Sequence, residues 1–153
     1  MAISSYMLVL KTIKIVHLCV VLRNGKLPYD NMDNLLSLSR EGDMTSSRKG
    51  IVDNLSMTYD GNMLASVSDS APAPSMTGST DFRDGVSEAV EYTYDRNGNM
   101  TSDLNRKVSL ISYNMQNRPA RMRHAGGTET FTYLPDGTKR GRTVLGKARS
   151  SAG

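Results

Sequence analysis

The chain has 153 residues, of which 38% are hydrophobic and 6% aromatic, with no Trp and a single Cys. This length allows one domain of ordinary size, and one cysteine excludes an intramolecular disulfide framework. The formal net charge of +4 is uneven, because residues 118–153 hold eight basic and two acidic side chains. A solvated strand face and a tail account for this excess, and no aromatic platform accompanies the arginines, which argues against a nucleic-acid partner.

The first segment in chain order, residues 1–28, is the most apolar part of the chain. Residues 12–22 are rich in β-branched side chains, which favours a strand, although a short helix and a membrane-associated segment also fit the pattern. Lys11 and Lys14 interrupt the apolar run, so it is no clear membrane span. It also lacks the small-residue cleavage site of a signal peptide.

From residue 29 onward the dominant feature is a recurring Tyr-Asp-x-x-Gly-Asn-hydrophobic pattern. Residues 94–100, Tyr-Asp-Arg-Asn-Gly-Asn-Met, are its fullest copy. The other copies are 29–35, with Asp33 in place of glycine; 59–63, which is shortened; and the more degenerate 113–119 and 133–138. The last three tyrosines lie 19 and 20 positions apart, and a repeat of about twenty residues fits one β-hairpin with its connection.

Local turn chemistry supports hairpins in these copies. Asp60-Gly61, Asn97-Gly98 and Asp136-Gly137 tolerate the positive φ of tight turns, so we expect reversals there. Period-two alternation around the first turn predicts one buried face, formed by Leu55, Met57, Tyr59, Met63, Ala65 and Val67. By the same reasoning, four aromatic residues should be more buried than the Ser, Thr and Asn beside them: Tyr59, Tyr94, Tyr113 and Phe131.

The predicted fold is therefore all-β, with tandem hairpins over residues 29–145. A Pro/Ser-rich stretch at 69–80 excludes a central strand and is interpreted as an insertion within one array, and 39–50 as a second polar connection. Residues 146–153 have nothing to bury and are expected to be a disordered tail. Neither end of the chain has the pattern of a capping repeat, so we expect a piece of a longer array.

The residues with chemical potential are scattered. Cys19, His17 and His124 have no recognisable zinc-ligand spacing, and packing explains them better than a nucleophilic pair or a metal site. The repeated Asp30, Asp60 and Asp95 each follow a tyrosine before a turn, where bonding to the local backbone accounts for them without calcium or acid–base chemistry. Gly126-Gly127 and Gly137-Thr138-Lys139 lack the context of a phosphate loop. The sequence therefore predicts no catalytic, cofactor-binding or metal-binding residues.

The ordered copies resemble the Rhs or YD-repeat family of bacterial proteins, best over residues 57–133, with 94–101 nearly a full motif. The resemblance implies a β-sheet that spirals into a hollow shell around a toxin, in proteins that are secreted or displayed on cells. It implies a non-enzymatic structural role for this chain, without a cofactor. The partners it implies are further repeats or self-association through open sheet edges, an enclosed toxin, or a surface carbohydrate. Alternatives are a carbohydrate- or surface-binding module and a small basic nucleic-acid-binding protein.

Overall fold

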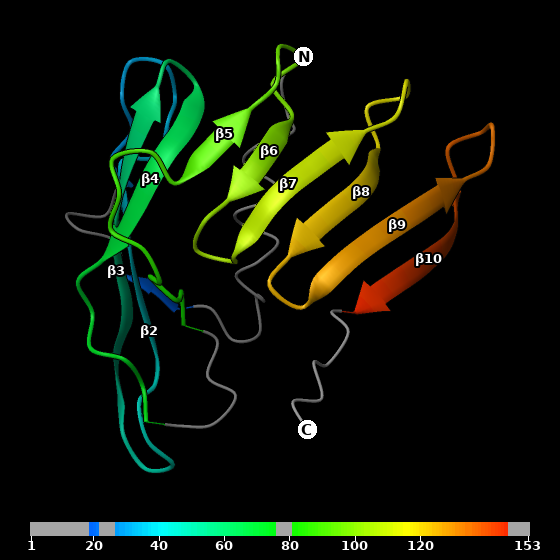
Figure 1. Cartoon of the computed structure of the whole chain (residues 1–153). Helices are drawn as coiled ribbons and strands as arrows, with labels where there is room; N and C mark the ends of the chain where they lie inside the picture. Colours follow the sequence, from blue (N-terminus) through cyan, green and yellow to red (C-terminus); the bar gives the residue numbers. More distant parts are fainter. Residues whose placement is uncertain (1–18, 22–26, 76–80, 147–153) are drawn as a thin grey trace. The chain divides into compact units, whose positions relative to one another are not determined.

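The computed structural model describes residues 19–21, 27–75 and 81–146, and every regular element within them is a β-strand (Figure 1). The prediction of an all-β fold is therefore confirmed. No helix in these described parts could span a membrane. Residue contacts divide the chain into two compact units, Met1–Glu91 and Tyr92–Gly153.

Each unit contains one antiparallel sheet in which spatial order follows chain order. The first sheet has four strands: β1 (Cys19–Val21), β2 (Ser37–Asp43), β3 (Lys49–Asp60) and β4 (Met63–Asp69). The second has six: β5 (Tyr92–Tyr94), β6 (Met100–Asp103), β7 (Val108–Tyr113), β8 (Pro119–His124), β9 (Gly127–Tyr133) and β10 (Lys139–Gly146). The expected hairpins thus lie in two separate sheets, with β4 in one and β5 in the other.

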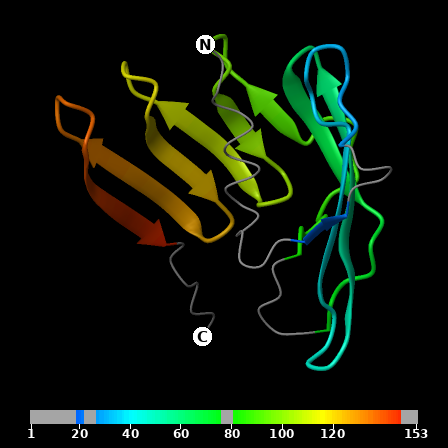
Figure 2. The ribbon, with the colours of Figure 1, turned by 180° about the vertical axis from the view of Figure 1, so that it is seen from behind.

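The reversals expected at the three glycine-containing pairs are confirmed. Gly61, Gly98 and Gly137 have positive φ values of 59°, 77° and 83°, and they lie between β3 and β4, β5 and β6, and β9 and β10. A fourth turn joins β7 to β8. Figure 2 shows the β5–β6, β7–β8 and β9–β10 turns at the same end of the second sheet, as an uninterrupted series of hairpins requires.

The predicted parity around the first turn is correct up to the turn and wrong just after it. Leu55, Met57 and Val67 are buried, but Met63 is exposed and Leu64 is buried in its place. The cause is a β-bulge: Thr58 pairs with Ser66 while Tyr59 pairs with Leu64, which leaves Ala65 as an extra residue on β4. One extra residue reverses the facing of the side chains beyond it.

The polar connection predicted at 39–50 is also wrong for most of its length. β2 continues to Asp43 and β3 begins at Lys49, so only residues 44–48 connect them. The prediction failed because charged residues such as Arg40 are typical of loops. In the structure Arg40 forms an ion pair with Asp53, its cross-strand neighbour, and both side chains are almost fully buried. A buried charge is tolerated in a sheet when it is paired in this way.

Residues 81–91 cover the edge of β4 that faces away from β3. The Glu91 carboxylate accepts the Val67 N–H at 3.0 Å, and the Asp84 carboxylate accepts the Asp69 N–H at 3.0 Å. The backbone N–H of Glu91 donates to the Ala65 carbonyl at 2.7 Å. Because these groups occupy the outward bonds of β4, the first sheet ends at this strand in the part of the chain that is described.

The core lies on one face of each sheet. In the first unit its apolar members are Leu35, Leu38, Val52, Leu55, Met57, Leu64 and Val67, and in the second Tyr92, Met100, Val108 and Ile111. Burial decreases along the second sheet until Val144 and Leu145 of β10 are 51% and 64% exposed.

The aromatic side chains follow the burial prediction in part. Tyr59 and Tyr94 are half-buried beside the exposed Thr58 and Thr93, as expected. Phe131 is half-buried between the half-buried Thr130 and the exposed Thr132, so the contrast is found on one side of it, whereas Tyr113 and its neighbour Ser112 are both half-buried.

The predictions for the N-terminal segment, the Pro/Ser-rich stretch and the C-terminal tail concern residues of which only a part is described. Residues 19–21 of the apolar N-terminal segment form β1 and pair with β2, in line with the strand interpretation, while 1–18 and 22–26 lie outside the description. Asp69 ends β4, residues 70–75 contain no strand, and 76–80 are not described. Gly146 is the last residue of β10, and the remaining tail, 147–153, is likewise outside the described ranges.

Candidate functional site: the tyrosine ladder and the turn edge

Four of the repeat copies form the same five-residue turn. These turns span residues 30–34, 95–99, 114–118 and 134–138, and in each the N–H of the first residue donates to the carbonyl of the fifth at 2.8–3.0 Å. The fourth residue donates back to the carbonyl of the first and has positive φ. That residue is Asp33, Gly98, Asn117 or Gly137, with φ of 63°, 77°, 55° and 83°. Asp and Asn are among the few non-glycine residues that adopt this conformation readily.

In three of these turns an acidic or amide side chain at the first position, that of Asp30, Asp95 or Asn114, bonds the backbone of the turn. In the fullest copy, Asp95 Oδ1 accepts the N–H groups of Asn97 and Asn99, each at 2.9 Å, and Asp95 Oδ2 accepts the Asn99 Nδ2 at 3.0 Å. Asp30 makes the corresponding bonds to Met32 and Asn34. The expected local role of these two aspartates is confirmed.

These hydrogen bonds favour the ionised carboxylates. The Asn34 side chain and then its N–H lower the pKa of Asp30, and Asn99 lowers the pKa of Asp95 in the same way. In the 134–138 turn, where Leu134 occupies the first position, Asp136 Oδ1 accepts the Thr138 N–H at 2.8 Å. This bond lowers the pKa of Asp136. Hydrogen bonds from N–H donors stabilise the charged form of a carboxyl group.

The tyrosines before the turns bind the preceding hairpin. The hydroxyl of Tyr113 donates to the Met100 carbonyl at 2.7 Å, and that of Tyr133 donates to the Pro119 carbonyl at 2.8 Å. In the first unit Tyr59 donates to the Leu35 carbonyl at 2.8 Å. We call these three bonds the tyrosine ladder. Each acceptor lies six positions after the tyrosine of the preceding copy, so each tyrosine ties its own hairpin to the one before it.

The acceptor carbonyls occupy one register position. Leu35 is bridged to Tyr29, Met100 pairs with Tyr94, and Pro119 pairs with Tyr113. Burial raises the pKa of Tyr113, and the negative charge of Asp95 adds to this effect. Both influences keep the phenol protonated and able to donate its hydrogen bond.

Contacts between successive turns run alongside the ladder. Asn97 Nδ2 and Asn99 Nδ2 each donate to Asn117 Oδ1 at 3.2 Å, and Gln116 Nε2 donates to the Pro135 carbonyl at 2.8 Å. In the first unit Asn34 Nδ2 donates to the Gly61 carbonyl at 3.1 Å. The polar residues of one copy therefore satisfy polar groups of the next.

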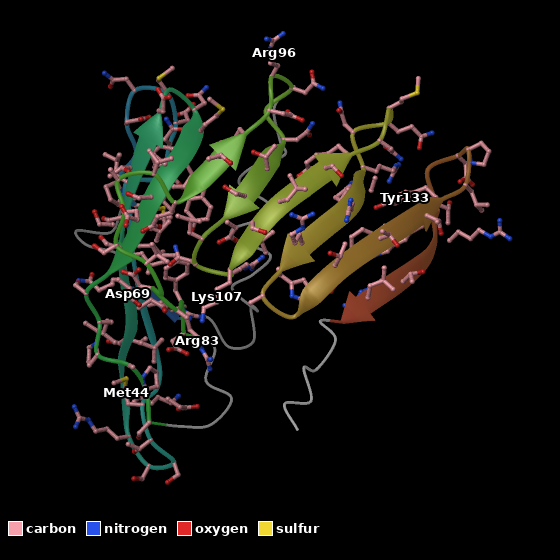
Figure 3. The ribbon with its side chains drawn as sticks, viewed as in Figure 1. Met44, Asp69, Arg83, Arg96, Lys107 and Tyr133 are labelled. Atoms are coloured by element: carbon pink, nitrogen blue, oxygen red, sulfur yellow. The ribbon has the colours of Figure 1, made fainter. Side chains whose placement is uncertain are left out.

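Some of the basic residues near the C-terminus belong to the same contacts. The Arg118 guanidinium lies 5.8 Å from the Tyr133 ring centre and occupies the space that a side chain at Gly137 would fill. Lys139 Nζ lies 4.1 Å from the Phe131 ring centre. Figure 3 shows Tyr133 at the turn end of β9. These arrangements are those of cation–π contacts, one between the 114–118 turn and β9 and one between β10 and β9.

Among the candidate chemical residues, His124 forms contacts within the second sheet. His124 Nε2 lies 3.2 Å from Glu129 Oε1, and its Nδ1 accepts the Gly126 N–H. Glu129 also accepts Arg142 Nε at 2.8 Å, and Arg142 lowers the pKa of this carboxyl group. Asp60 lies in the last position of β3 and is exposed. Cys19 is in β1, and His17 lies outside the described residues.

The described part of the chain holds no group of three or more His, Cys, Asp or Glu side chains that could hold a metal ion. A cavity of about 400 Å³ in the first unit is lined partly by Asp69 and Asp84. Asp84 is bonded to β4, and Asp69 accepts the N–H groups of Asn54 and Ala71 at 2.9 Å. These two carboxylates of the cavity wall therefore hold the loop and the strands together.

The sequence predicts the turns, but neither the tyrosine ladder nor the buried Arg40–Asp53 pair was predicted from it. In each copy the carbonyl that accepts the next tyrosine's hydroxyl lies six positions after the copy's own tyrosine. This constant separation could have indicated the ladder. The buried pair has no such signal, because its partners are 13 positions apart on two strands. Comparison of the chain with protein-family models, curated proteins and solved structures finds no match.

Proposed function

We propose that this chain is a non-enzymatic structural repeat protein of the Rhs or YD-repeat type, whose hairpins form part of the wall of a β-shell. The observation that carries the proposal is the tyrosine ladder, in which the recurring tyrosine bonds the backbone of the preceding hairpin three times over. A residue whose role is to join one repeat to the next serves an extended scaffold. Repeat proteins gain their stability from such nearest-neighbour interfaces.

The other recurring positions support the same role. The first-position Asp or Asn bonds its own turn, and amide side chains of one turn reach the next. The polar residues of the pattern are thus engaged with the protein's own backbone and neighbouring copies. In the shell that we propose, the wall would enclose or present a secreted toxin or a surface module.

Hydrogen exchange on the full chain tests the scaffold role. Replacing Tyr133 with Phe should speed amide exchange in β8 as well as β9, because the lost hydroxyl joins these hairpins. Faster exchange confined to β9 would contradict the proposal. The coding sequence on either side of this chain tests the shell: we expect further Tyr-Asp copies at spacings of about twenty residues, and their absence on both sides would contradict it. Hydrolytic activity that was lost on replacing His124 would overturn the non-enzymatic assignment.

A further inference from the structure

The outer edges of β4 and β10 differ in how they are covered. The edge of β4 is bonded to residues 81–91 through the Glu91 and Asp84 carboxylates and the Glu91 N–H. β10 pairs with β9 on one side, and among the described residues no strand pairs with its other side. An uncovered strand edge presents backbone donors and acceptors to any strand that can align with it.

The β10 edge repeats the geometry of an interface that already exists within the sheet. Lys139 pairs with Tyr133, as Pro119 pairs with Tyr113 and Met100 with Tyr94. The Pro119 and Met100 carbonyls each accept a tyrosine hydroxyl from the following hairpin. The Lys139 carbonyl therefore holds the register position at which the next hydroxyl of the ladder would arrive.

The side chains of β10 indicate the chemistry of the strand that would fit. Val144 and Leu145 are largely exposed apolar residues at this edge. Three basic residues lie on the strand: Arg142 is paired with Glu129, Lys139 lies over the Phe131 ring, and Arg140 is exposed. A strand with acidic residues near its tyrosine would complement this charge, since opposite charges on adjacent strands attract.

We propose that the β10 edge binds an acidic β-hairpin from outside residues 1–153, which carries a tyrosine before its turn and donates that hydroxyl to the Lys139 carbonyl. The inference rests on the proposed repeat scaffold and names the edge of the second sheet at which the tyrosine ladder continues. β-strand addition of this kind gains affinity from backbone bonds and specificity from side chains.

The test uses the full chain and a cyclised peptide that copies residues 91–103, which contains Tyr94, three acidic residues and one basic residue. Binding is measured by fluorescence anisotropy of the labelled peptide. We expect saturable binding, and about five-fold weaker binding when Tyr94 of the peptide is replaced by Phe, the effect of one net hydrogen bond. No binding, or equal binding of the two peptides, would overturn the proposal.

Matched variants of the chain locate the site. Arg140→Glu on β10 should weaken binding several-fold, and Arg140→Gln should weaken it less. Arg121→Glu, a charge reversal at another exposed position, on the interior strand β8, should leave binding unchanged. Circular dichroism checks that each variant is folded. Loss of binding in the Arg121 variant with retention in both Arg140 variants would contradict the assignment to β10.

Sedimentation of the chain without peptide tests the rival occupant. We expect the same size at all concentrations; a concentration-dependent dimer that Arg140→Glu dissociates would show that a second copy of this chain occupies the edge, which overturns the separate hairpin. The exchange experiment on Tyr133→Phe distinguishes the two proposals. If that variant loosens both β8 and β9 but no peptide binds, the scaffold stands and the docking site is wrong.

Discussion

Replacing Tyr113 with Phe should weaken the second sheet by removing one bond of the tyrosine ladder. The hydroxyl of Tyr113 donates to the Met100 carbonyl at 2.7 Å, and Met100 is buried, with 6% of its surface exposed. Phe keeps the ring and its packing and deletes only the donor. A typical hydrogen bond contributes about 1 kcal/mol net, and an acceptor left unsatisfied in a buried place costs roughly 1–3 kcal/mol. We therefore expect the free energy of unfolding to fall by about 1–2 kcal/mol.

Urea denaturation followed by far-ultraviolet circular dichroism measures this loss, because the chain has no Trp to report unfolding. Tyr29→Phe is the matched control, since the Tyr29 side chain is 53% exposed. A substitution at such a site should change stability by less than about 0.5 kcal/mol. Because the chain has two compact units that need not unfold together, amide exchange in β6 and β7 provides the local measurement.

Equal losses in the Tyr113 and Tyr29 variants would refute the reasoning, because the exposed hydroxyl has no buried acceptor to leave unsatisfied. A loss in the Tyr113 variant without faster exchange in β6 would also refute it. In that case the change would act through the packing of the ring and not through the Met100 carbonyl.

Three further predictions concern carboxylates. Glu91→Ala should lower the free energy of unfolding by about 1–3 kcal/mol in urea denaturation, because the Val67 N–H loses its acceptor, whereas Glu91→Gln retains one and should lose less. Asp95→Ala should speed amide exchange in its turn, and Asp95→Asn should do so less, since Asn114 holds the same place in the next turn. The contribution of Asp30 and Asp95 to the free energy of unfolding should be complete above pH 3.8, their ordinary pKa, and should decline as the pH falls through their lowered pKa values. A variant with Asn at both positions should lack this decline in acid, and an unchanged decline would contradict the prediction.

The turns could be predicted because their chemistry is local. Gly61, Gly98 and Gly137 lie in dipeptides that favour reversals, and each is found with positive φ between two strands. Asp33 and Asn117 adopt the same conformation without glycine, and the hydrogen bonds of their turns show that these copies kept the geometry despite the changed residue.

Features that depend on distant residues could not be predicted in the same way. The bulge at Ala65 reverses side-chain facing within one strand, and its extra carbonyl is bonded by the Glu91 N–H, 26 positions further along the chain. A charged residue such as Arg40 is typical of a loop, and its place in a strand is explained only by its ion pair with Asp53. The division into two sheets depends on residues 81–91, which carry no strand pattern of their own.

The degenerate copies indicate which position of the pattern is hardest to replace. The 133–138 copy has Leu134 where others have Asp or Asn, yet its turn forms, with Gly137 at positive φ and Asp136 bonded to Thr138. The 59–63 copy has a shorter turn altogether. Both keep the tyrosine and its bond to the preceding hairpin. A turn can be stabilised by several local residues, whereas the carbonyl on the neighbouring hairpin needs a donor at the end of a long, rigid side chain, so the selective constraint should be stronger on the tyrosine than on the aspartate.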